Sequence, residues 1–273
     1  MSLTQIRFNY AASATQTALG RIGRQNAKSM LALTSGKRIN STEDDASGFS
    51  LARGFEATRR SVDQALNNVA TAGNMLNMAA SSYQTVYDLL LSMKEWVIQG
   101  ADDSYTSAQR ASIQGMINAM VAEIDETVDQ ATFQGNRLID GSFTGKKIQA
   151  SARAGVSFNI DLDAADSIAL GVDSIDISSS TNARLELSVL DDAMIVLEQA
   201  MQTAGEALIR LRSRESTLRV KMNAAEAVRS GIEDTDYVRE KMNYTKSQMI
   251  QELGFIALKD ALAAPQQVLS LFA

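Results

Sequence analysis

Apolar residues recur at alternating steps of three and four along the stretch from Leu187 to Arg229. They are Leu187, Leu190, Met194, Leu197, Met201, Ala204, Leu208, Leu211, Leu218, Met222 and Ala225, with a polar interruption at Glu215. A repeat of about 3.5 residues keeps one stripe against a partner only if the helices supercoil left-handedly, so the pattern predicts a long coiled-coil-like helix. At ~1.5 Å per residue this stripe is roughly 58 Å long. Because such a rod cannot bury its own stripe, other segments or other copies of the chain must lie alongside it.

The rest of the composition favours helix and disfavours catalysis. The chain of 273 residues contains one proline, and 5% of its residues are aromatic, so few residues interrupt a helix. It has no cysteine and no histidine, which excludes disulfides, thiolate and histidine metal sites, and the Ser/His/Asp and Cys/His catalytic triads. We therefore expect a protein that is not an enzyme and that has no catalytic residues, no cofactor and no metal site.

Charge and hydropathy narrow the choice of partners. The net charge of −6 disfavours nucleic acid, which attracts a cationic surface. Four arginines do cluster, at Arg210, Arg212, Arg214 and Arg219, but the spacing of Glu206 to Arg210 and of Glu215 to Arg219 predicts ion pairs on a solvated helix face. No stretch approaches the ~20 apolar residues of a membrane span, so no membrane partner is expected. The start of the chain lacks the apolar core of a secretory leader, so we expect no signal peptide, and export, if it occurs, would use a route that cleaves no such leader.

The first part of the chain predicts three helices. The first runs from Ser2 to Leu33 and ends at Thr34 to Gly36, since glycine closes a helix in the left-handed conformation. In the polar link that follows, Ser41 and Asp44 have capping-box spacing. The second helix is expected from Ala46 to Gln99 and the third from Ser107 to Ala131.

The same apolar period in three segments predicts a supercoiled bundle. In the second helix the stripe is Ala52, Phe55, Val62, Leu66, Val69, Gly73, Leu76, Ala80, Tyr83, Tyr87, Leu90 and Val97, with Gly73 admitting a close neighbour and the two tyrosines in the core. The residues predicted to form the bundle core are Val62, Leu66, Val69, Leu76, Ile113, Ile117, Leu190, Leu197, Leu208 and Leu211.

A small β region interrupts the helices at about 134–180. Glycines recur there, and Val156 to Ile160 and Ile175 to Ile177 are β-prone. Five aspartates lie in this region, at Asp161, Asp163, Asp166, Asp173 and Asp176. Their spacing does not match a calcium-binding EF-hand loop, so we interpret them as solvated turn residues.

Both ends of the chain are apolar helices joined by polar links to the middle. The last helix is expected from about Tyr237 to Ala263, with apolar residues on two faces, and Val268, Leu269 and Leu271 follow Pro265. Such ends would promote aggregation of a monomer, which favours burial among several copies. The residues predicted to serve assembly are Leu3, Ile6, Leu19, Ile22, Met242, Met249, Leu253, Ile256, Val268, Leu269 and Leu271.

The predicted organisation is an N-terminal helix of an inner core at 1–40, a helical bundle with its β region at 41–230, and a C-terminal helix of the inner core at 231–273. The fold class is mainly α, with long heptad-patterned helices in a coiled-coil-like bundle, a small β-hairpin insertion and terminal helices that pair in a filament core.

Three separated motifs, in this order, resemble those of bacterial flagellins. They are LTSGKRINSTEDDASG at Leu33 to Gly48, FQGNRLI at Phe133 to Ile139, and SGIEDTDY followed by SQMIQELGFIALKDALAAPQQVLSLFA at the end of the chain. The resemblance covers essentially the whole chain and implies a structural subunit that polymerises into the flagellar filament, outside the cell, for swimming. The large variable outer domain of many flagellins is missing.

The resemblance also implies partners. They are further copies of the chain in a helical filament, a flagellar export chaperone, the type III export apparatus, and the filament cap and junction proteins. Recognition by the innate immune receptor for flagellin is expected to be weak, because Ser92 stands where recognised members carry an arginine and Met116 where they carry a glutamate.

Two alternatives to a filament subunit have distinguishable consequences. A related hook–filament junction protein would share the terminal helices but would be present in few copies. A soluble coiled-coil adaptor would stay monomeric under all conditions.

Overall fold

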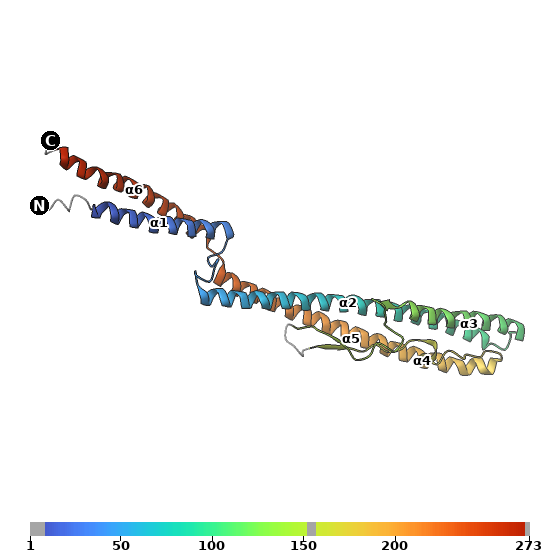
Figure 1. Ribbon diagram of the computed structural model, residues 1–273. Helices are drawn as coiled ribbons and strands as arrows, with labels where there is room; N and C mark the ends of the chain where they lie inside the picture. The colour runs from blue at the N-terminus through green and yellow to red at the C-terminus, as the bar shows by residue number, and fades with distance from the viewer. Residues whose placement is uncertain (1–8, 152–156, 271–273) are drawn as a thin grey trace. The chain divides into compact units, whose positions relative to one another are not determined.

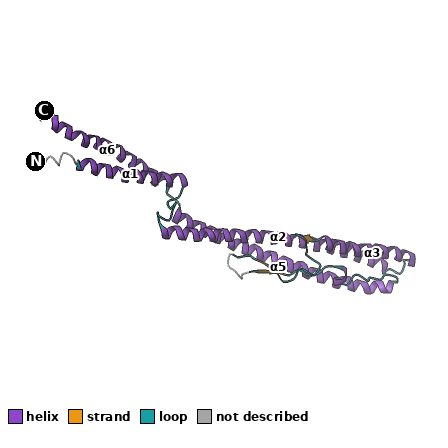
Figure 2. Cartoon of the chain, viewed as in Figure 1, coloured by secondary structure: helices purple, strands orange, loops and turns teal. Residues whose placement is uncertain are grey.

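The computed structural model describes residues 9–151 and 157–270, with side chains up to Ala264 (Figure 1). The chain forms two compact units. Met1–Ala57 and Ala224–Ala273 make one, called the terminal unit below, and Thr58–Asn223 make the other, the bundle unit. The predicted fold class is confirmed, since long helices pack together and the strands are confined to small antiparallel pairs (Figure 2).

In the terminal unit, α1 (Tyr10–Ser35) has a defined beginning and end. The Asn9 side chain accepts a hydrogen bond from the backbone N–H of Ala12 at 3.0 Å, which caps the helix. At the other end Gly36 has φ 72°, so the predicted glycine stop is confirmed. The predicted start at Ser2, with Leu3 and Ile6, lies outside the described residues.

The last helix is longer than predicted. α6 covers Tyr237–Ser270 and continues through Pro265, so the expected end near Ala263 is wrong. Proline removes one backbone hydrogen bond and crowds the preceding turn, but the residues after it are compatible with helix. The helix before it, α5 (Ser180–Glu233), also ends later than the expected Arg229.

The bundle unit is built from α3 (Ser107–Gln130) and from most of α2 (Ala46–Gly100) and of α5, whose outer ends belong to the terminal unit. On α2 one series of buried residues alternates by threes and fours: Val62, Ala65, Val69, Ala72, Leu76, Ala79, Tyr83, Val86, Leu90, Met93 and Val97; Ala52 and Met75 are buried as well. On α5 they are Ala183, Leu190, Ala193, Leu197, Ala200, Ala204, Ala207, Leu211 and Leu218. The predicted heptad period is therefore present on both helices, and alanine fills many of the buried positions.

Several residues of the apolar stripe predicted for α2 are not the ones that the structure buries. At these places the buried residue is the neighbouring one in the sequence. Leu66 and Tyr87 are only partly buried, and nothing lies within 4 Å of a Cβ built on Gly73, so the expected close approach at that glycine is wrong. The core takes Ala65, Ala72 and Val86 in their place, because a small side chain lets neighbouring helices approach closely.

α3 begins with a capping box that the sequence analysis did not identify. The Thr106 hydroxyl accepts from the backbone N–H of Gln109, and the Gln109 side chain accepts from the backbone N–H of Thr106. Ile113, Ile117, Ile124 and Val128 of this helix are buried in the core.

The β region contains two short antiparallel pairs and one helical turn. β1 (Thr132–Phe133) pairs with β2 (Asn136–Arg137), and β3 (Lys146–Ile148) pairs with β4 (Phe158–Ile160). Gln134 and Gly135 have φ 51° and 80°, which makes the FQGN segment a primed two-residue turn. α4 (Ser167–Leu170) follows.

Ile175 to Ile177 is not a strand, contrary to prediction. The Gln114 side chain accepts from the Ile177 backbone N–H at 2.9 Å and donates to the Ile175 carbonyl at 2.7 Å. These bonds satisfy the backbone without a neighbouring strand, while both isoleucine side chains are buried in the core.

The prediction of two core tyrosines is confirmed for Tyr83 and only in part for Tyr87, and both hydroxyls are hydrogen-bonded. Tyr83 is fully buried and donates to the Asp163 carbonyl at 2.6 Å, whereas Tyr87 is half-buried and donates to Glu198 at 3.2 Å. Trp96, the single tryptophan of the chain, packs partly buried against the same core. Within the described residues, no helix combines the length and hydropathy that a membrane span requires.

Tyr83→Phe is expected to destabilise the bundle unit by roughly 1 kcal/mol, because the variant loses the hydrogen bond that the buried Tyr83 hydroxyl donates to the Asp163 carbonyl. Burial, with the charge of Asp163, raises the pKa of the Tyr83 hydroxyl above its ordinary value. Since only the unfolded chain then releases this proton, stability present below about pH 10 is lost as the pH rises further. Urea unfolding at neutral and alkaline pH measures both effects. Equal alkaline losses in the parent and the variant would contradict the role of Tyr83.

Candidate assembly surface

The terminal unit is centred on the antiparallel pair of α1 and α6 (Figure 1). Near one end the Asn9 side chain donates to the Ala261 carbonyl at 2.6 Å, and further along Asn26 donates to the Gln251 side chain at 2.6 Å. Between these contacts Leu19 packs on Gly254, where an added Cβ would lie 2.7 Å from Leu19 Cδ2. The glycine therefore sets how closely the two helices approach.

This pairing buries little apolar surface. On α1 the buried apolar residues are Ala12, Leu19 and Ala32. Ser29 is completely buried, and both its hydroxyl and the side-chain amide oxygen Oδ1 of Asn26 lack a hydrogen-bond partner among the described residues. Buried polar atoms without partners cost free energy, so two helices joined in this way are weakly stable by themselves.

α6 exposes large apolar side chains on more than one face. Tyr237, Val238, Met242, Met249, Ile250, Leu253, Phe255, Ile256 and Leu262 are all exposed. Leu253 keeps 65% of its surface accessible and Met242 61%. Exposed apolar side chains on this scale mark an interaction surface, and its size exceeds what α1 alone could cover.

The predicted assembly residues fall into three groups in the structure. Met242, Met249, Leu253 and Ile256 are exposed on α6. Leu19 is buried inside the α1–α6 pair and Ile22 is half-buried. Leu3, Ile6 and Leu271 lie outside the described residues, as do the side chains of Val268 and Leu269.

Eight of the ten predicted bundle-core residues are buried together: Val62, Val69, Leu76, Ile113, Ile117, Leu190, Leu197 and Leu211. The other two, Leu66 and Leu208, are partly buried and pack against that cluster.

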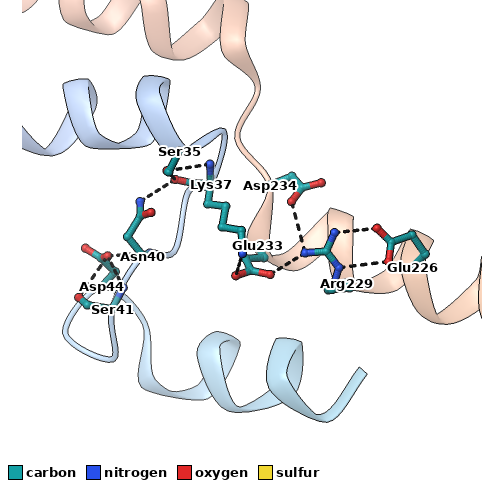
Figure 3. A network of polar contacts seen from close by, with 9 residues as sticks. All are labelled: Ser35, Lys37, Asn40, Ser41, Asp44, Glu226, Arg229, Glu233 and Asp234. Carbon is teal, nitrogen blue, oxygen red and sulfur yellow. Dashed lines mark hydrogen bonds and ion pairs between the residues drawn. The ribbon is translucent and has the colours of Figure 1, made fainter. Parts of the chain in front are cut away.

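In the terminal unit, polar residues join the segment that follows α1 to the end of α5 (Figure 3). The Glu233 carboxylate, only 6% exposed, accepts from Lys37 Nζ at 2.8 Å and from Arg229 Nη1 at 2.8 Å. Arg229 Nη2 also pairs with Glu226 at 2.7 Å. The Glu233 backbone carbonyl accepts from the N–H of Arg38 at 2.6 Å. These bonds hold the end of α5 against the segment after α1.

Sequence reasoning missed this network, although part of its signal was visible. Glu226, Arg229 and Glu233 have i,i+3 and i,i+4 spacing on one helix, which favours ion pairs. Burial by itself would raise the pKa of Glu233, but hydrogen bonds from Lys37 and Arg229 outweigh it and lower the pKa. The Glu233 carboxylate is therefore ionised at neutral pH.

Ser41 and Asp44 shape the loop and do not cap α2, contrary to prediction. Asp44 accepts from the backbone N–H groups of Asn40 and Ser41 and pairs with Lys28 at 2.8 Å. The hydrogen bond from Lys28 and the two loop amides lower the pKa of Asp44 to about 2. The cap is Asp45, whose side chain accepts from the Gly48 N–H at 2.9 Å.

The arginine cluster is only partly ion-paired as predicted. Arg219 pairs with Glu215 at 2.7 Å. Arg210 instead lies over the Phe158 ring, with its Cζ 4.7 Å from the ring centroid, and Glu206 accepts a hydrogen bond from Gln202. The hairpin thus provides an aromatic face that the spacing along α5 alone did not reveal. Among the described residues no three carboxylates converge as a metal site.

Two family models match this chain. The bacterial flagellin N-terminal helical region matches residues 6–144, and the bacterial flagellin C-terminal helical region matches residues 187–272. Together they cover both helical parts of the sequence and leave out the β region after residue 144.

Similar proteins extend over nearly the same length. The chain is 29% identical to the flagellar filament 33 kDa core protein of Treponema phagedenis, an alignment that covers 97% of this chain and 99% of that protein. It is 27% identical to a flagellin of Halalkalibacterium halodurans, over 90% of this chain and 92% of the relative.

Solved structures share the fold at low identity. The crystal structure of Bacillus cereus flagellin has a TM-score of 0.50 at 22% identity and covers 56% of this chain and 88% of that one. A protein from Vibrio parahaemolyticus described as flagellar hook-associated has a TM-score of 0.58 at 16% identity, over 70% of this chain and all of that one.

Proposed function

The chain belongs to the bacterial flagellin family as a structural, non-enzymatic subunit of the flagellar filament, and we propose that its copies meet through the apolar surface of α1 and α6. The observation that carries this proposal is the exposed apolar series on α6 from Tyr237 to Leu262. A solvated α6 would leave these side chains in water, whereas neighbouring copies would bury them.

Seeded polymerisation tests this assignment. Purified chain is added to short filament fragments, and growth is followed by electron microscopy and sedimentation. Filaments are expected to lengthen with added chain, and Leu253→Ser with Ile256→Ser should prevent growth. Glu252→Ser, an exposed polar change on the same helix, is the control. Growth of the double variant at the parent rate would contradict a role for the α6 surface.

In the free chain, residues 1–40 and 237–273 are expected to be largely unfolded while the bundle unit stays folded. The reason is the small apolar contact between α1 and α6 and the two buried polar atoms without partners. Limited proteolysis of monomer and filament measures the difference. Protease should remove both ends of the monomer within the time that leaves 58–223 intact, and should spare them in filaments. Equal resistance of ends and bundle in the monomer would contradict the expectation.

The expected unfolding of both apolar ends in the free chain is also a reason to propose further partners. We propose that a flagellar export chaperone covers the C-terminal segment, that the type III export apparatus delivers the chain out of the cell, and that the filament cap and junction proteins contact it at the ends of the filament. The support is the exposed apolar surface of α6 together with family membership.

The innate immune receptor that recognises flagellins is expected to respond weakly to this chain. Ser92 of α2 bonds its own helix through a hydroxyl that donates to the Asp88 carbonyl, and Met116 of α3 is 44% exposed and uncharged. Loss of an arginine from the centre of an interface commonly costs about 2 kcal/mol or more. Receptor-expressing reporter cells measure the response. Ser92→Arg with Met116→Glu should increase it, and potent signalling by the unchanged chain would overturn the expectation.

A further inference from the structure

An open pocket of about 640 Å³ lies between α2 and the β region. Its apolar wall includes Met75, Phe133, Phe143 and Ile148, and the polar residues around it include Asn68, Thr71 and Gln149. Two lysines, Lys146 and Lys147 of β3, also line it, and both are exposed. Neither lysine pairs with a carboxylate among the residues that the structure describes, although Lys146 lies over the Phe143 ring at 5.8 Å. The pocket therefore suits an apolar group accompanied by negative charge.

An apolar side chain flanked by negative charge, as this pocket requires, lies at α4. We call this surface, formed by Ile168 with Asp166 and Asp173, the Ile168 knob. Ile168 is 75% exposed, the largest exposed fraction among the large apolar side chains of the bundle unit. Asp166 and Asp173 flank it in sequence, and neither carboxylate has a basic partner in the described part of the chain. This Ile168 knob is fixed to the bundle because Asp125 of α3 accepts from both the backbone N–H and the hydroxyl of Ser167 at 2.9 Å.

The charge of the bundle unit is also uneven: basic residues are in excess around the pocket, and acidic residues are in excess around the Ile168 knob. Among the described residues the half around the pocket carries ten Lys or Arg and five Asp or Glu, counted over 58–83, 131–151, 157–161 and 201–223. The half around the knob carries three Lys or Arg and sixteen Asp or Glu, counted over 84–130 and 162–200. Opposite charge on two different surfaces favours contact between copies and orients it.

We infer that the pocket binds the Ile168 knob of a second copy of this chain, with Lys146 and Lys147 facing the carboxylates of Asp166 and Asp173. The inference rests on the filament function and adds a contact outside the α1–α6 surface. Because knob and pocket are different surfaces of one unit, the contact is heterologous and can repeat without closing, as a filament requires.

The helical rise sets the offset between copies. Thr71 of the pocket lies 29 residues before the end of α2, about 44 Å, whereas Asp125 lies 18 residues after the start of α3, about 27 Å. The two helices are joined by a short turn and run back along each other, so the knob and the pocket are separated by roughly 15 Å along the bundle. In the proposed contact two bundle units therefore lie side by side, and one is displaced along the bundle axis by about this distance relative to the other.

Cross-linking in filaments tests the contact directly, since the chain has no cysteine of its own. Full-length Lys147→Cys and Asp173→Cys variants are mixed in equal amounts, polymerised on seeds and treated with a short bis-maleimide. Cross-linked dimers are expected from the mixture and not from filaments of either variant alone. Lys147→Cys mixed with Glu123→Cys, an exposed carboxylate position on α3, is the control and should give none.

Assembly of point variants provides a second measurement. Ile168→Ser should raise the concentration needed for filament growth about tenfold or more, because a large apolar side chain loses its burial. Leu185→Ser, 65% exposed on α5, should leave it unchanged, and both chains should melt like the parent. Filaments that form normally but give no dimers from the first mixture would overturn this contact and leave the filament function intact. Failure of the parent chain to grow on seeds would count against the proposed function itself.

Discussion

Removal of Pro265 to Ala273 is expected to abolish filament formation and to leave the bundle unit folded. The segment carries four large apolar side chains, Val268, Leu269, Leu271 and Phe272. At roughly 1.5 to 3 kcal/mol for each one fully buried, their loss removes several kcal/mol from every subunit that adds to a filament. The buried cluster of the bundle unit ends at Leu218, so the deletion takes nothing from it.

Two measurements separate assembly from folding in this truncation. Circular dichroism reports the helical fold, and sedimentation after seeding reports filament yield. The full-length chain with Val268, Leu269 and Leu271 replaced by Ser should fail in the same way, whereas Glu252→Ser should sediment like the parent. A normal filament yield from the truncated chain would show that the segment is not needed for assembly.

Gly254→Val is expected to reduce filament yield at least tenfold without a change in the stability of the bundle unit. The added Cβ alone would lie 2.7 Å from Leu19 Cδ2 and 3.3 Å from its Cγ, so the leucine side chain must move, and the two further carbons of valine enlarge that displacement. α1 and α6 would then separate, and this would disrupt the apolar surface through which the copies are proposed to meet. Filament yield and thermal unfolding of the monomer are the measurements.

Gly231→Val is the matched control, because that glycine is also in a helix of the terminal unit and nothing lies within 4 Å of its Cβ position. It carries the same cost of a β-branched residue in a helix. Leu19→Ala combined with Gly254→Val should restore part of the yield by making room for the valine. If the control and the Gly254 variant lose equal amounts of filament, packing on Leu19 is not the cause.

Periodicity along α5 and α2 predicted the bundle, because a heptad stripe is a property of local sequence. It could not decide between neighbouring apolar residues. On α2, Leu66 and Ala65 both fit a three-four alternation, and the predicted stripe runs through Leu66. The structure buries Ala65, since the spacing between helices depends on the partner surfaces, which no single segment encodes.

Local structure at the ends of helices and in the β region depends on contacts between residues that lie far apart in the sequence. Ile175 and Ile177 look β-prone, but the side chain of Gln114, 61 and 63 residues away, replaces a strand partner. Glu233 likewise receives Lys37 from the opposite end of the chain. Spacing of i,i+4 type on a helix could reveal the half of that network made by Arg229, but not the half made by Lys37.

The candidate surface on α6 was predictable in part. Apolar residues at Met242, Met249, Leu253 and Ile256 pointed to burial, and an amphipathic pattern on two faces pointed to more than one partner. The glycine contact at Leu19 was not predictable, because the register between α1 and α6 comes from packing and from the Asn9 and Asn26 side chains. The pocket beside β3 depends on how the β region folds over α2, which local propensity does not specify.

Trp96 gives this chain an optical label that belongs to one unit only. The terminal unit contains tyrosines, such as Tyr237 and Tyr244, but no tryptophan. Indole emission, excited where tyrosine does not absorb, therefore follows the unfolding of the bundle unit alone, while far-ultraviolet ellipticity follows all the helices. A denaturation curve recorded both ways separates the two units without any added dye, and a difference in midpoint between the signals measures how independently the ends lose their structure.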